Sequence, residues 1–157
     1  MRKWIVTLVF FGFFSLGFCS NHIRQSITIG VGPINELSFS IGEICLYLER
    51  DGLQKRYEKD DFSTFYSIMT NEDAKKIVAY IDDILPSGID LFVKLDPPAG
   101  AYNTGFTVLE PFPKDVVVNI NRVQGNMLQV SYKLSSNDQA IEMKPQNKTV
   151  TYLLVDM

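Results

Sequence analysis

Apolar and polar residues alternate with a period of two along most of this chain, which is typical of β-strands with one buried face. The alternation predicts short strands at residues 23–31, 37–41, 44–48, 62–70, 89–95, 106–109, 127–134 and 149–155. Turn-forming residues separate several of them, among them Gly32-Pro33 and residues 124–126. Residues 96–100 contain two consecutive prolines and predict a loop, because a central strand cannot hold them. The charge-rich residues 54–61 predict a solvated loop.

Residues 72–85 fit two structures. Their apolar side chains recur at helical spacing, acidic residues begin the segment and Pro86 would end it, so the local pattern predicts a helix. The alternative is a strand at 74–82, with Ile77, Ala79 and Ile81 on the core side. The strand agrees better with its neighbours and makes residues 85–88 a turn between paired strands.

The N-terminus has the three regions of a secretory signal peptide. Arg2 and Lys3 precede an apolar run of about a dozen residues, and small residues then offer a cleavage site after Cys19. Two alternatives are a lipoprotein signal, with lipid on Cys19, and an uncleaved anchor. The sequence therefore predicts a signal helix at 1–19, a single domain at 20–157, and a secreted, periplasmic or cell-surface location.

Charge and cysteine content narrow the classes of partner and of stabilising bond. Without Arg2 and Lys3, 13 basic residues face 18 acidic ones, a balance of −5. This balance argues against nucleic acid, because binding phosphates needs clustered lysine and arginine. Membrane contact is expected only through the signal or a lipid on Cys19. Cleavage leaves Cys45 alone, so we expect no internal disulfide and interpret Cys45 as a small buried hydrophobe.

The sequence holds no recognisable catalytic or cofactor motif. His22, the one histidine, follows the cleavage region, where a positioned catalytic base is not expected. Zinc needs about four cysteine or histidine ligands, which the exported chain does not offer, and no calcium-binding loop spacing occurs. We therefore expect no catalytic residues, no cofactor and no metal, and we do not expect an enzyme.

Several short patterns occur together in a fixed order along the chain. A segment ending in Thr70-Asn71 is followed by Lys-Ile-x-Ala at 76–79, Leu-Pro-Ser-Gly at 85–88 and Leu-x-Val-x-Leu at 91–95. Further matching pieces lie at 115–117, 128–134 and 149–156. In this order the chain resembles small exported bacterial proteins of largely uncharacterised function. The resemblance implies an immunoglobulin-like or pilin-like β-sandwich of about seven to nine strands, and the charged insert at 54–61 departs from the usual pattern.

Two functions follow as expectations from these patterns. The first is an exported, non-catalytic structural or interaction protein of the cell envelope or surface, as part of a larger assembly. Its partner would be another envelope protein, or a second copy joined through an edge strand at 149–155, although that strand can also simply close its own sheet. The alternative is a carbohydrate- or peptide-binding module that uses aromatic loops. The candidate interaction surface consists of Tyr57, Phe65, Tyr102 and Phe112.

Overall fold

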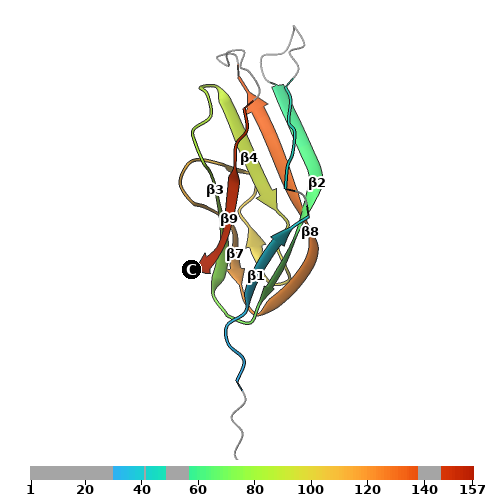
Figure 1. Ribbon diagram of the computed structural model, residues 1–157, viewed down its shortest axis with the longest axis vertical. Helices are drawn as coiled ribbons and strands as arrows, with labels where there is room; N and C mark the ends of the chain where they lie inside the picture. Colours follow the sequence, from blue (N-terminus) through green and yellow to red (C-terminus); the bar gives the residue numbers. More distant parts are fainter. Residues whose placement is uncertain (1–29, 41, 49–56, 138–145) are drawn as a thin grey trace, which may run out of the picture. The chain divides into compact units, whose positions relative to one another are not determined.

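The computed structural model describes residues 30–40, 42–48, 57–137 and 146–157 (Figure 1). The chain forms two units, 1–31 and 32–157, and the fold below is that of the second. The described residues form an all-β structure of antiparallel strands without a helix. They therefore include no helix long and apolar enough to span a membrane. The predicted signal at 1–19 and most of the predicted strand at 23–31 lie outside the described residues.

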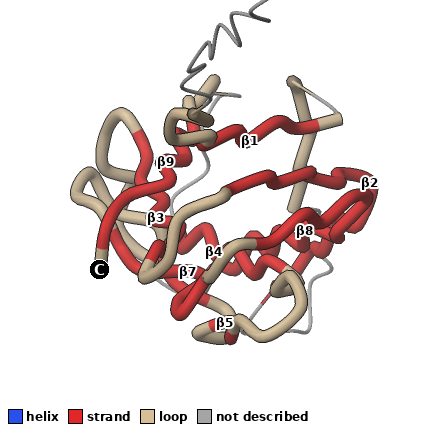
Figure 2. The backbone as a smooth tube through the Cα atoms, turned by 90° about the horizontal axis from the view of Figure 1, so that it is seen from below, coloured by secondary structure: helices blue, strands red, loops and turns tan. Residues whose placement is uncertain are grey.

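The described residues form nine strands, which are divided between two antiparallel sheets (Figure 2). The first sheet contains, in spatial order, β1 (Asn35–Phe39), β2 (Tyr57–Thr70), β8 (Val123–Ser136), β4 (Ile89–Leu95) and β6 (Thr107–Val108). The second contains β5 (Tyr102–Asn103), β7 (Lys114–Ile120), β3 (Lys75–Ile81) and β9 (Val150–Asp156). Neighbours in space are mostly distant in sequence, so the chain crosses repeatedly from one sheet to the other.

One buried cluster draws its side chains from both sheets. Its members are Tyr66, Ile68, Ile77, Ala79, Ile81, Leu91, Val93, Leu95, Ala101, Leu109, Val116, Val117, Ile120, Val130 and Tyr132. Along β4, alternate residues enter the cluster, as the period of two predicts. Burying one Val, Leu or Ile side chain contributes about 1.5–3 kcal/mol, so this cluster is a major source of stability.

The segment with two predicted structures is a strand. β3 lies between β7 and β9, and Ile77, Ala79 and Ile81 are almost completely buried. The helix alternative at 72–85 is wrong, and the strand at 74–82 with these three residues on the core side is confirmed. A strand in this place hydrogen-bonds on both edges and covers the core with β-branched side chains, which outweighs its local helical spacing.

The turn at residues 85–88 is present, but it joins two sheets. The Ile89 amide donates to the Pro86 carbonyl at 3.1 Å, and Gly88 has a φ of 82°, which glycine adopts without strain. β3 pairs with β7 and β9, whereas β4 pairs with β6 and β8. The prediction that this turn connects paired strands is therefore wrong.

Two further predictions are wrong in the long pair formed by β2 and β8. Residues 57–61 are part of β2 instead of a loop, and residues 124–126 are part of β8 instead of a turn. The pairing slips between Tyr66 and Ile68, where β8 contains a bulge. A Cβ on Gly125 would lie 2.9 Å from a Leu128 methyl, so the glycine permits close packing at this bulge.

The segment around Cys45 differs from its prediction. Residues 44–48 are extended but form no strand, and Ile44 and Leu46 pack against the core. Cys45 lies between them and is exposed, so its interpretation as a buried hydrophobe is wrong. The predicted alternation of side chains holds here, since Ile44 and Leu46 face the core and Cys45 faces outward.

Candidate functional site

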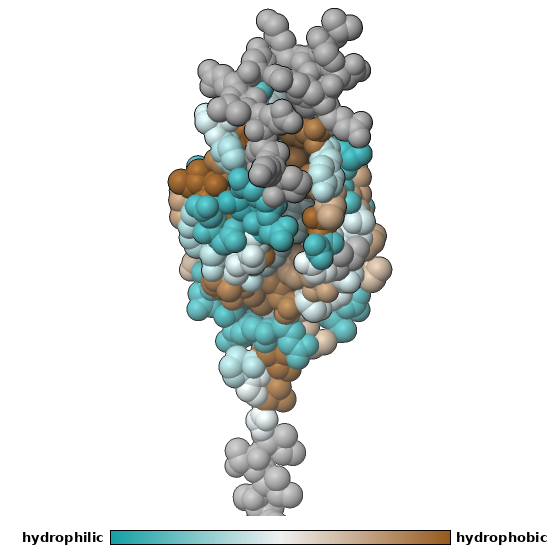
Figure 3. All heavy atoms as spheres, turned by 45° about the horizontal axis from the view of Figure 1, so that its top comes forward, coloured by the Kyte–Doolittle hydropathy of each residue, from teal (hydrophilic) through white to brown (hydrophobic). Residues whose placement is uncertain are grey.

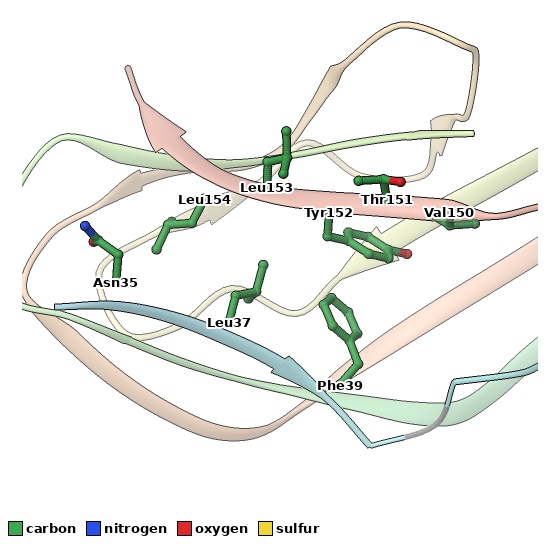
Figure 4. A pocket seen from close by; sticks show the side chains of 8 residues that line it. All are labelled: Asn35, Leu37, Phe39, Val150, Thr151, Tyr152, Leu153 and Leu154. Carbon is green, nitrogen blue, oxygen red and sulfur yellow. The ribbon is translucent and has the colours of Figure 1, made fainter. Parts of the chain in front are cut away.

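Two edge strands lie beside each other along one side of the domain. β1 ends the first sheet and β9 ends the second, and each pairs with one described neighbour, β2 and β3 respectively. Figure 4 shows the two strands facing each other across a gap. No backbone hydrogen bond joins these two described strands. Each therefore keeps one row of N–H and C=O groups that pair with no strand of the described part.

The gap between these strands is a groove of about 530 Å³. It is lined by Asn35, Leu37, Phe39, Val150, Thr151, Tyr152, Leu153 and Leu154. Leu37 and Phe39 point from β1 toward β9, while Leu154 points back toward β1 and Leu153 points away (Figure 4). The groove thus combines apolar side chains with two backbone edges, and we call it the β1–β9 groove.

Stacked aromatic rings form the deep wall of the β1–β9 groove. The Phe39 ring lies 4.4 Å from the Tyr152 ring and 5.9 Å from the Tyr66 ring, centroid to centroid. The Tyr152 and Tyr132 hydroxyl oxygens lie 2.7 Å apart and link β9 to β8 in the other sheet. Burial raises the pKa of Tyr152 far above its usual value, so the phenol stays neutral and hydrogen-bonded. The wall is therefore aromatic and uncharged.

A polar network closes the Asn35 end of the groove. Lys75 Nζ lies 2.6 Å from Glu72 Oε2 and 2.6 Å from Asp156 Oδ1. The Asn35 amide Nδ2 donates to Glu72 Oε2 at 2.6 Å. Since Asn35 belongs to β1 and Asp156 to β9, the network bridges the groove at this end.

The four aromatic residues predicted as an interaction surface do not come together. Tyr57 begins β2, and its side chain lies outside the described part; Phe65 is half-buried further along β2. Tyr102 is 65% exposed on β5 in the other sheet, opposite Val118, and Phe112 is 53% exposed before the opposite end of β7. None of them lines the β1–β9 groove. Figure 3 shows apolar residues interspersed with hydrophilic ones on the described surface.

The sequence predicts one wall of the groove, β9, but not the position of the other wall, β1. Residues 149–155 were predicted as a strand that is either an edge or a closing strand, and β9 is both: it pairs with β3 along its length and leaves its other side open. β1 was predicted as a strand, but its position opposite β9 depends on pairing with β2. The contact between Lys75 and Asp156 joins residues 81 positions apart, which no local pattern reports.

The described residues contain no group of three or more His, Cys, Asp or Glu side chains placed to hold a metal ion. Comparison of the chain with protein-family models, with curated proteins and with solved structures found no match. The arrangement of the β1–β9 groove is therefore the basis for any functional conclusion.

Proposed function

We propose that this chain is an exported, non-catalytic structural or interaction protein of the cell envelope or surface. On this proposal its two sheets form an immunoglobulin-like β-sandwich, and the β1–β9 groove binds an extended strand. The strand comes from a second copy or from another envelope protein. The observation that carries the proposal is a pair of strand edges that no other described strand partners and that flank one groove.

Strand addition uses the two features that the groove combines. An incoming strand forms main-chain hydrogen bonds with an exposed edge, and its alternate side chains enter pockets that give specificity. Leu37, Tyr152 and Leu154 would contact the inward side chains, while the outward ones remain in solvent. A volume of about 530 Å³ lies within the range of about 300–1,000 Å³ that is usual for binding pockets.

Such binding would also cover a surface that is otherwise a hazard. β9 lies at the edge of its sheet among the described strands, and its one charged residue is Asp156. Exposed apolar edges promote uncontrolled pairing unless they are covered or blunted. A specific partner strand in the β1–β9 groove would prevent this.

Self-association of the exported chain tests the proposal. We expect dimers or larger species whose fraction rises with concentration in sedimentation experiments. Leu154→Lys places a charge in the groove and should abolish them, whereas Leu153→Lys is the matched control on the outward face of the same strand. Melting curves must show that both variants fold. Equal effects of the two substitutions on association would contradict a role for the groove.

A second candidate function has separate support. Tyr102 and Phe112 are exposed, and the Phe106 ring lies 4.7 Å from Lys133 Nζ and 6.0 Å from Lys94 Nζ. Exposed aromatic rings beside polar groups suit stacking against a carbohydrate or contact with a peptide. A glycan array probed with the exported chain tests this function. Binding that survives Leu154→Lys and is lost in Tyr102→Ala or Phe106→Ala would favour it over strand addition.

A further inference from the structure

The polar network at the Asn35 end of the groove is centred on a lysine that is almost buried. Lys75 is 7% exposed as a whole residue, and its ammonium contacts the carboxylates of Glu72 and Asp156 at 2.6 Å each. A lysine is rarely buried to this degree unless its charge is paired. Its charge therefore depends on both carboxylates, which come from different parts of the chain.

The network continues to the opposite strand. Glu72 Oε2 accepts a hydrogen bond from Asn35 Nδ2, and Asn35 Oδ1 accepts one from the Thr70 hydroxyl at 2.8 Å. A continuous series of contacts thus runs from β1 through Glu72 and Lys75 to Asp156 in β9. It links the two strands that flank the groove at this end.

The turn that carries Glu72 has a strained backbone. Ala74 has a φ of 57°, in the left-handed region that costs free energy for residues other than glycine. Its amide donates to Asn121 Oδ1 at 2.8 Å, and its carbonyl accepts from the Met157 amide at 2.8 Å. Strained residues persist only where their surroundings hold them, and they gather at switch regions. The C-terminal end of β9 is one of these surroundings.

We propose that Glu72, Lys75 and Asp156 form an ionic latch that fastens β1 to β9 at one end of the groove and opens when Glu72 is protonated. The latch itself does not depend on the proposed function. Its consequence, that opening admits a strand to the β1–β9 groove, rests on that function. Protonation of Glu72 removes one of the two negative charges that pair with the nearly buried Lys75 ammonium.

The direction of the pH effect follows from the charges at this end. Hydrogen bonds from Asn35 and Lys75 hold the pKa of Glu72 below its ordinary value near 4.5. Its stabilising contribution is therefore complete above about pH 4.5 and is lost as the pH falls through the lower folded-state pKa. Hydrogen bonds to Asp156 and Glu72 raise the pKa of Lys75, so the ammonium stays charged from acid to well above neutral pH.

The surrounding charged groups are paired elsewhere or exposed. Arg122 Nη2 lies 3.0 Å from Asp73 Oδ2, and Lys76 Nζ lies 2.9 Å from Asp115 Oδ1. On β1 the neighbouring Glu36 is exposed. Among the described residues, these charged groups lie on β1, β3, β7 and the turns beside β3. Lys76 also provides a control, because it is the next residue on β3 and its ion pair lies outside the latch.

Hydrogen–deuterium exchange of the exported chain tests the latch. At pH 7, Lys75→Met should raise exchange about tenfold at amides of β1 and at residues 154–157, and Lys75→Arg should restore protection. Lys76→Met should leave these amides unchanged. When the unmodified chain is titrated from pH 5 to pH 2 and corrected for intrinsic rates, the same amides should lose protection as the pH falls. Equal protection in Lys75→Met and Lys76→Met, with no acid effect, would overturn the latch.

A second variant separates the latch from folding and from strand binding. Glu72→Gln keeps an acceptor for Asn35 and removes the charge, so it should open the latch at pH 7 without unfolding the domain. If Glu72→Gln raises exchange and also raises self-association, the latch controls the groove. If exchange rises and association does not, the control of the groove is refuted, while the latch itself is supported.

Discussion

Replacing Tyr152 with phenylalanine tests whether the groove wall is tied across the two sheets. The Tyr152 and Tyr132 hydroxyl oxygens lie 2.7 Å apart and belong to β9 and β8. Tyr152→Phe removes one hydroxyl and leaves the other without this partner in a part-buried place. A buried polar group that loses its partner costs about 1–3 kcal/mol. We therefore expect the free energy of unfolding to fall by about 1–2 kcal/mol, or the melting temperature by about 4 °C.

A double-mutant cycle shows whether this cost belongs to the pair. Tyr132→Phe should cost a similar amount, and the double variant should cost little more than either single one, with a coupling free energy of about 1 kcal/mol. Urea unfolding at pH 7 measures these values, because burial keeps both phenols neutral there by raising their pKa. Tyr102→Phe, on an exposed side chain, should change stability by less than about 0.5 kcal/mol. Additive costs of the two core substitutions would refute the cross-sheet tie.

Three other predictions follow from the fold and its N-terminus. Ile81→Asp should lower the free energy of unfolding by roughly 3 kcal/mol or more, because it buries a charge, while Leu153→Asp on the exposed face should cost far less. Equal losses of stability in urea unfolding would contradict the orientation of β3 and β9. Stability should fall as the pH drops below about 4.5, and Glu72→Gln should reduce that dependence; an unchanged pH profile in the variant would show that Glu72 contributes nothing. Intact-mass measurement of exported material should show the loss of about 19 or 20 residues, and a species that still begins at Met1 would contradict cleavage.

Strands with a regular alternation of buried and exposed residues were predictable from sequence, whereas β5 and β7 were missed; in β7 two consecutive valines, Val116 and Val117, are both buried and break the alternation. β4 matches its predicted range of 89–95, because its alternation is regular and Gly88 and residues 96–98 bound it. β3 could be predicted as a strand only from the alternation in the segments on either side of it, since its own apolar spacing fits a helix as well. Charged residues 57–61 gave no alternation of apolar side chains, so their part of β2 was mistaken for a loop.

The sequence did not predict which strands pair with one another or which strands lie at a sheet edge. β2 pairs with β8, more than fifty residues away, and no local feature of either strand specifies this partner. The groove exists because β1 and β9 both occupy sheet edges, which is a property of the whole topology. Likewise, the sequence alone does not distinguish Lys75 from an ordinary surface lysine, because its contact with Asp156 exists only in the folded chain. The resemblance to small exported bacterial proteins stays a prediction.

Site-specific photo-crosslinking in the native envelope tests the central claim most directly. A photoreactive amino acid replaces Leu37, which faces the β1–β9 groove, or Leu153, which points away from it on β9. If the groove holds a partner strand, the probe at position 37 should give one defined crosslinked species whose peptide mass maps to an extended segment of a second copy or of another envelope protein. The probe at position 153 should not give that species. No crosslink at position 37, or the same crosslinks from both positions, would contradict strand binding in the groove.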